Sequence, residues 1–91
     1  MKREAYPFAR IAEHDYPAFR ELLAREMPET YPGWLAMMKR RHYEEMFHGY
    51  DVKEVDVTPG AYARFCIERG QPHDLKSLRD FVVEIASGRS S

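Results

Sequence analysis

The residues best suited to chemistry lie together in segment 39–48, Lys-Arg-Arg-His-Tyr-Glu-Glu-Met-Phe-His. Glu45 and His48 are three residues apart, and Glu44 and His48 are four apart, so a helix would place either pair on one face. A carboxylate beside an imidazole suits zinc, iron or manganese. Two ligands do not complete a metal site. The residues elsewhere in the chain that could complete it are His14, Asp51 and His73.

The simpler interpretation of this segment is a solvated helix end. His48 would then lie near the negative C-terminal end of the helix dipole, where a cationic imidazole is stabilised. We therefore expect no cofactor, and Glu45 and His48 stay as the only candidates for a metal site.

Lys39, Arg40 and Arg41 form the only run of three basic residues in the chain. Successive helical residues point about 100° apart, so the three side chains do not form one patch. Arg40 and Arg41 are each followed four residues later by a glutamate, and such pairs stabilise a helix by about 0.2–0.5 kcal/mol. A solvated face is the favoured interpretation, and a nucleic-acid-associated regulator that uses this basic helix is the alternative.

Cys66 is the only cysteine and stands beside Tyr62 and Phe65 in an apolar helical stripe. A buried thiol is inert, so we expect a core residue rather than a nucleophile with His73 as its base. The sequence has no nucleophile elbow, no glycine-rich phosphate loop and no paired cysteines for zinc. An ordinary metabolic enzyme is therefore not expected.

Large apolar side chains are dense around the helix expected over 32–48. They cover more than one stripe, so this helix should contact both the core and a second surface. The residues that we expect to bind a partner are Trp34, Met38 and Phe47, with Arg40 and Arg41 as a rim. Trp, Met, Phe and Arg are enriched in protein interfaces. The competing interpretation is that these side chains fill a thin core.

The composition indicates one small soluble domain over residues 1–91. The 14 basic and 15 acidic residues nearly cancel, which excludes a protein that coats nucleic acid through overall charge. Ten arginines, four lysines and no asparagine indicate a GC-rich bacterial genome. The residues at the start of the sequence lack the pattern of a signal peptide, and no apolar run reaches about 20 residues, so we expect no signal peptide and a cytoplasmic protein without a membrane partner.

Turn and cap residues divide the chain into six elements in the order β-α-α-β-α-α. The expected strands are 5–12, where Pro7 indicates an edge strand, and 52–57. Gly49 and Gly70 are expected to end helices. The expected N-cap residues of the four helices are Asp15, Thr30, Thr58 and Asp74.

The two halves of the chain, 5–48 and 52–87, have similar apolar patterns, and residues 88–91 are expected to be a frayed tail. A tandem duplication would explain the similarity. The common pattern of two amphipathic helix pairs would explain it equally.

The expected architecture is α+β, a short two-stranded antiparallel sheet packed against two helical hairpins. Such a sheet is marginal in water and has open edges. A homodimer would solve this, through the second strands or the spare face of the second helix. The alternative is a monomer with all helices over one sheet face. We therefore expect a homodimeric interaction or adaptor module, which also binds another protein through the second helix.

Overall fold

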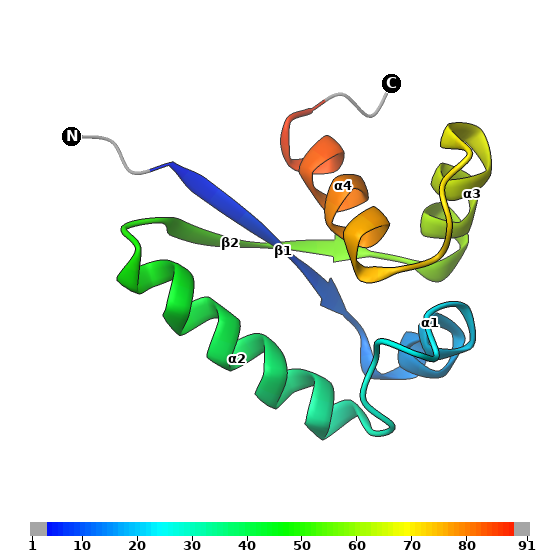
Figure 1. The fold of residues 1–91 in the computed structure, drawn as a ribbon, viewed down its shortest axis with the longest axis horizontal. Helices are drawn as coiled ribbons and strands as arrows, with labels where there is room; N and C mark the ends of the chain where they lie inside the picture. The colour runs from blue at the N-terminus through cyan, green and yellow to red at the C-terminus, as the bar shows by residue number, and fades with distance from the viewer. Residues whose placement is uncertain (1–3, 89–91) are drawn as a thin grey trace.

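The computed structural model describes residues 4–88, which form two strands, four α-helices and one 3₁₀ turn (Figure 1). In chain order these elements are β1 (Ala5–Ile11), η1 (Glu13–Asp15), α1 (Tyr16–Leu22), α2 (Tyr31–Phe47), β2 (Asp51–Val57), α3 (Pro59–Arg69) and α4 (Leu75–Ala86). The predicted α+β composition is therefore confirmed. Most of the predicted tail, residues 89–91, lies outside the described residues.

Local signals in the sequence place the starts of the helices and the end of α3 correctly. The side chains of Thr30, Thr58 and Asp74 each accept a hydrogen bond from the backbone N–H three residues later, at 3.1, 3.3 and 2.8 Å. Asp15 occupies the N-cap position of α1 without a side-chain hydrogen bond. Gly70 follows α3 at a φ of 61°, in the left-handed region that glycine adopts without steric cost.

The two strands run parallel, so the predicted antiparallel sheet is wrong. Pairing extends from Ala5 with Asp51 to Ile11 with Val57. An antiparallel pair would require both helices between the strands to run along the sheet, as two passes. However, α1 has only 7 residues and contacts α3, whereas the 17 residues of α2 span about 25 Å, close to the length of about 23 Å of a seven-residue strand. Only α2 returns the chain along the sheet, and a single return makes the strands parallel.

The sheet lies between α2 on one side and α4 on the other (Figure 1). The helices are thus not all on one sheet face. The ring of Phe8 in β1 lies 4.5 Å from the ring of His42 in α2, between centroids. The apolar side chains that form the buried core are Phe8, Ile11, Tyr16, Phe19, Leu23, Met27, Trp34, Met38, Val57, Tyr62, Phe65, Cys66, Leu78, Phe81 and Val82.

The predicted half-repeats 5–48 and 52–87 correspond to β1-α1-α2 and β2-α3-α4, and their common origin stays a prediction. Each helix within residues 4–88 is too short or too polar to cross a membrane.

Candidate functional site

The partner-binding residues predicted from the sequence lie on two sides of α2. Trp34 and Met38 are 2% and 9% exposed and belong to the core. Phe47 is 90% exposed on the outer side of the helix. Arg41 lines a cavity on the inner side, and Arg40 lines a depression beside it. A partner on the inner side would therefore meet Trp34 and Met38 only through that cavity.

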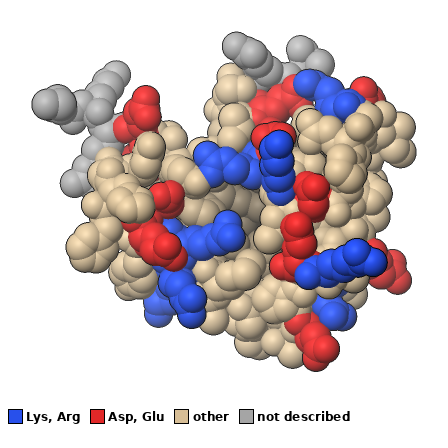
Figure 2. Space-filling view, viewed as in Figure 1, with Lys and Arg blue, Asp and Glu red and all other residues tan. Residues whose placement is uncertain are grey.

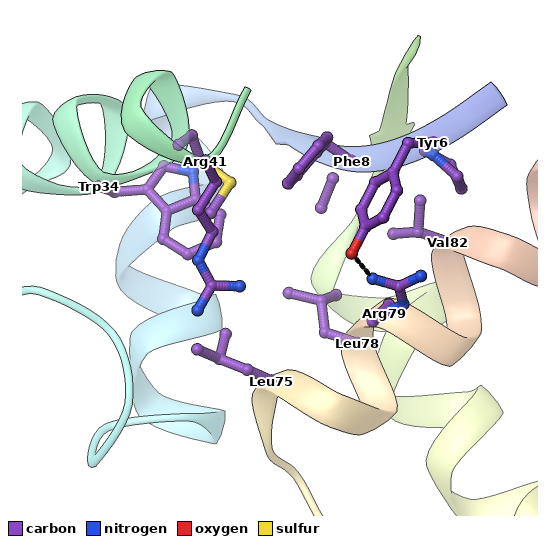
Figure 3. A pocket seen from close by; sticks show the side chains of 11 residues that line it. Tyr6, Phe8, Trp34, Arg41, Leu75, Leu78, Arg79 and Val82 are labelled. Carbon is purple, nitrogen blue, oxygen red and sulfur yellow. Dashed lines mark hydrogen bonds between the residues drawn. The ribbon is translucent and has the colours of Figure 1, made fainter. Parts of the chain in front are cut away.

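A cavity of about 60 Å³ lies between α2, β1 and α4 (Figure 3). Its back is formed by four consecutive residues of β1, Tyr6–Ala9. The residues of α2 and α4 that line it are Trp34, Met38, Arg41, Leu75, Leu78, Arg79 and Val82. The lining is therefore mostly apolar, and the charged groups in it are two guanidinium groups.

A wider depression of about 460 Å³ adjoins the cavity along α2 and shares Tyr6, Phe8 and Arg41 with it. The residues that it adds are Met37, Arg40, Glu44 and Glu45. Figure 2 shows the molecule hollowed between α2 and α4, with both basic and acidic side chains at the margin of the hollow. We call the cavity and the depression together the α2–α4 groove.

Arg41 and Arg79 face the groove without an acidic partner. Within residues 4–88, neither guanidinium has a carboxylate oxygen within 4.0 Å. Arg79 donates a hydrogen bond to the hydroxyl of Tyr6, and its Cζ lies 4.3 Å from the centroid of the Tyr6 ring, which orients it (Figure 3). On the open surface, by contrast, Arg10 donates two hydrogen bonds to Asp56, at 2.6 and 2.9 Å, and these lower the pKa of that carboxyl.

The predicted ion pairs of Arg40 with Glu44 and of Arg41 with Glu45 do not form within 4.0 Å in the described part of the chain. Glu45 instead lies beside His48, with its Oε1 at 3.2 Å from Nδ1 of the imidazole. Arg41 therefore faces the groove without the neutralising contact that the sequence spacing predicted.

The pair of Glu45 and His48 is also the predicted metal candidate. The structure brings these two side chains together but gathers no set of three or more histidine, cysteine or acidic residues around a point, as far as residues 4–88 show. His14 and His73, which were candidates to complete the metal site, do not form such a set with Glu45 and His48 in the described part of the chain.

The outer edge of β1 forms part of the groove. The N–H of Asp51 donates to the carbonyl of Glu4 at 2.8 Å, so even-numbered residues of β1 direct their peptide groups to β2. The alternate residues direct theirs outward, and these are Ala5, Pro7, Ala9 and Ile11. At Ile11 the carbonyl accepts a hydrogen bond from the hydroxyl of Tyr31 at 2.7 Å, which closes this end of the edge.

The outer face of α2 carries a second apolar surface. Tyr43, Met46 and Phe47 are 57%, 51% and 90% exposed, and their spacing of three and four residues places them side by side. Leu35 is 49% exposed and lies about three turns before Met46 on the same side. We call these four residues the α2 outer patch.

Cys66 is 2% exposed, as the sequence predicted for a core thiol. Its Sγ lies 3.8 Å from Oγ of Ser77, which is itself 2.6 Å from the hydroxyl of Tyr62. Burial raises the pKa of Tyr62. These side chains connect α3 to the start of α4, and their polar atoms form hydrogen bonds with one another inside the core.

The sequence did not identify the α4 side of the groove. Leu75, Leu78 and Val82 have the spacing of an apolar helical stripe, and Arg79 stands next to Leu78 in the sequence. The signal was only that an arginine borders this stripe. Nothing local indicated that Arg79 contacts Tyr6, because more than 70 residues separate them.

No protein-family model matches this chain, and comparison with curated proteins and with solved structures gives no match either.

Proposed function

We propose that this protein is an interaction module that binds an acidic segment of another protein in the α2–α4 groove. The observation that carries the proposal is the pair of guanidinium groups, Arg41 and Arg79, above an apolar cavity without an acidic partner. A carboxylate of the partner would supply the missing charge, and an apolar side chain beside it would enter the cavity.

Two features support a polypeptide as the occupant. The groove combines apolar walls, paired cations and an open strand edge, and a polypeptide offers a complement to all three. The cavity also has the size of a side-chain pocket, about 60 Å³. It is large enough for a single aliphatic side chain.

The proposal predicts binding of a capped peptide of alternating valine and glutamate. Trp34 is the only tryptophan and lines the cavity, so its emission should shift as the peptide enters. Charge reversal by Arg41→Glu or Arg79→Glu should weaken binding at least about tenfold, because it replaces an attraction with a repulsion. Titration followed by Trp34 fluorescence measures both effects.

Arg64→Glu provides the matched control, since Arg64 is exposed on α3 and makes the same charge change away from the groove. It should leave peptide affinity within about twofold. Equal weakening by all three reversals would show only a general charge effect. Peptide binding that is indifferent to Arg41 and Arg79 would refute the proposed site.

We also propose a homodimer, formed when a second copy covers the α2 outer patch. Charge complementarity supports a second copy as the occupant. In an antiparallel pairing of two α2 helices about a two-fold axis near residue 42, Arg40 of one copy, at the border between the groove and the outer patch, faces Glu44 of the other. Neither residue has an ion-pair partner within residues 4–88, so both are available for that contact.

The homodimer predicts a molar mass of two chains in light scattering. Phe47→Glu should reduce the mass to one chain, because it puts a charge within the apolar contact. Ile67→Glu on α3, where Ile67 is 80% exposed, should leave the dimer intact. A single-chain mass for the unmodified protein at every concentration contradicts the homodimer, and a dimer that survives Phe47→Glu places the interface elsewhere.

We propose the cytoplasm as the location of the protein. Support comes from Cys66, the only cysteine, which is buried as a free thiol of the kind that reducing compartments maintain.

A further inference from the structure

We infer that the partner segment binds in extended form, as a third strand added to the outer edge of β1. This inference rests on the proposed function and specifies how the partner is recognised. The observation that supports it is that the residues of β1 behind the cavity, 6–9, are consecutive in the strand. Consecutive residues of a strand alternate between its two faces, so a cavity lined by all of them lies along the edge of the strand.

The backbone groups that such a strand would use are on the open edge. Pro7 and Ala9 direct their peptide groups away from β2, by the alternation that the bond between Asp51 and Glu4 fixes. Pro7 offers a carbonyl alone, and Ala9 offers both an N–H and a carbonyl. Tyr31 closes the edge beyond them at Ile11. The open part of the edge therefore includes the length of the cavity and ends at Ile11, where Tyr31 closes it.

The two helices provide walls on both sides of the added strand. Alternate side chains of an extended segment point to opposite faces. One set would meet Trp34 and Met38 of α2, and the other would meet Leu78 and Val82 of α4, which all line the cavity. Strand addition with pockets for alternate side chains is a known mode of peptide recognition.

The charges of the cavity favour an acidic segment over a second copy of this chain, because Glu44 and Glu45 line only the wider depression beside it. Arg41 stands on the α2 wall and Arg79 on the α4 wall, so carboxylates on either face of the strand find a cation (Figure 3). Two copies that joined their β1 edges would instead bring four uncompensated arginines together. They would also have to fit α2 and α4 of both copies around one edge.

The test uses three forms of the capped valine–glutamate peptide: unmodified, and N-methylated at alternate residues in each of the two registers. An added strand directs every second N–H to β1, so methylation in one register should weaken binding at least about tenfold. Methylation in the other register should change it less than about threefold. Amide hydrogen exchange of the full chain gives a second readout. The peptide should protect the N–H of Ala9, whereas Phe8 and Arg10, which already face β2, should keep their exchange rates.

The outcomes separate this inference from the proposed function. If the peptide binds through Arg41 and Arg79 but both methylated forms bind as well, the groove takes a polypeptide without strand addition, and this inference is wrong. Failure of the unmodified peptide to bind overturns both. Displacement of the peptide by a single-stranded oligonucleotide, with a steep dependence on salt, would assign the arginines to nucleic acid and also overturn both.

Discussion

Replacing Trp34 with alanine is expected to lower the free energy of unfolding by about 3–5 kcal/mol. Trp34 is 2% exposed and lies against the ring of Tyr16, with 6.1 Å between centroids. Trp34 and Met38 are the only buried residues of α2 among those that the structure describes. The substitution therefore removes one of two anchors of the helix that connects the strands. A small domain has about 5–15 kcal/mol of stability in total, so the variant should be near the limit of folding.

Urea denaturation followed by circular dichroism measures this effect. Ile67→Ala is the matched control, because Ile67 is an apolar residue of α3 outside the outer patch and is 80% exposed. Its cost should be below about 1 kcal/mol. Equal costs for the two substitutions would contradict the assignment of Trp34 to the core. They would support the interpretation that this side chain acts at an exposed interface.

Replacing Tyr62 with alanine should also lower the free energy of unfolding by about 3–5 kcal/mol. Phenylalanine at the same position should lower it by about 1 kcal/mol. The Tyr62 ring is 0% exposed and packs between Phe19 and Phe81, at 5.9 and 6.0 Å between centroids. Phenylalanine keeps these ring contacts and removes only the hydroxyl. Ser77 loses the Tyr62 contact but still donates to the carbonyl of Asp74 at 2.9 Å, so the cost of that change stays small.

The same residue makes stability depend on pH in the alkaline range. Burial raises the pKa of Tyr62 above its ordinary value of about 10. At a pH above about 10, the unfolded chain loses the phenolic proton while the folded chain keeps it. The unfolded state then binds fewer protons, so the free energy of unfolding falls as pH rises. Denaturation at several pH values should show this fall.

Tyr62→Phe should make the alkaline loss of stability shallower, because phenylalanine has no proton to lose. Part of the slope should remain, since burial also raises the pKa of Tyr16. An unchanged slope in Tyr62→Phe would show that other groups cause the alkaline loss.

The sequence was sufficient for features that depend on near neighbours in the chain. Thr30, Thr58 and Asp74 were predicted as helix caps, and each bonds a backbone N–H only three residues away. The sequence also identified Cys66 as a core residue from the apolar spacing around it. These interactions form within a single turn, so residue type and spacing determine them.

The direction of the strands depends on contacts between elements that are distant in the sequence, so local patterns did not predict it. A pattern of two helices between two strands does not say which helix runs back along the sheet. The short α1 packs against α3, and the long α2 covers the length of the strands. Helix lengths would have favoured this answer, because 7 helical residues span only about 10 Å.

The sides of α2 were also decided by tertiary packing. Its sequence has apolar residues around most of the helix, so spacing alone did not show that Trp34 and Met38 face the core while Phe47 faces outward. The groove could not be predicted at all, because it joins Tyr6 near one end of the chain to Arg79 near the other. Local chemistry fixed the caps and the elements of this protein. The direction of its sheet and the position of its groove were decided by packing between elements that are distant in the sequence. Burial of apolar area stabilises such contacts as well as it stabilises contacts between near neighbours.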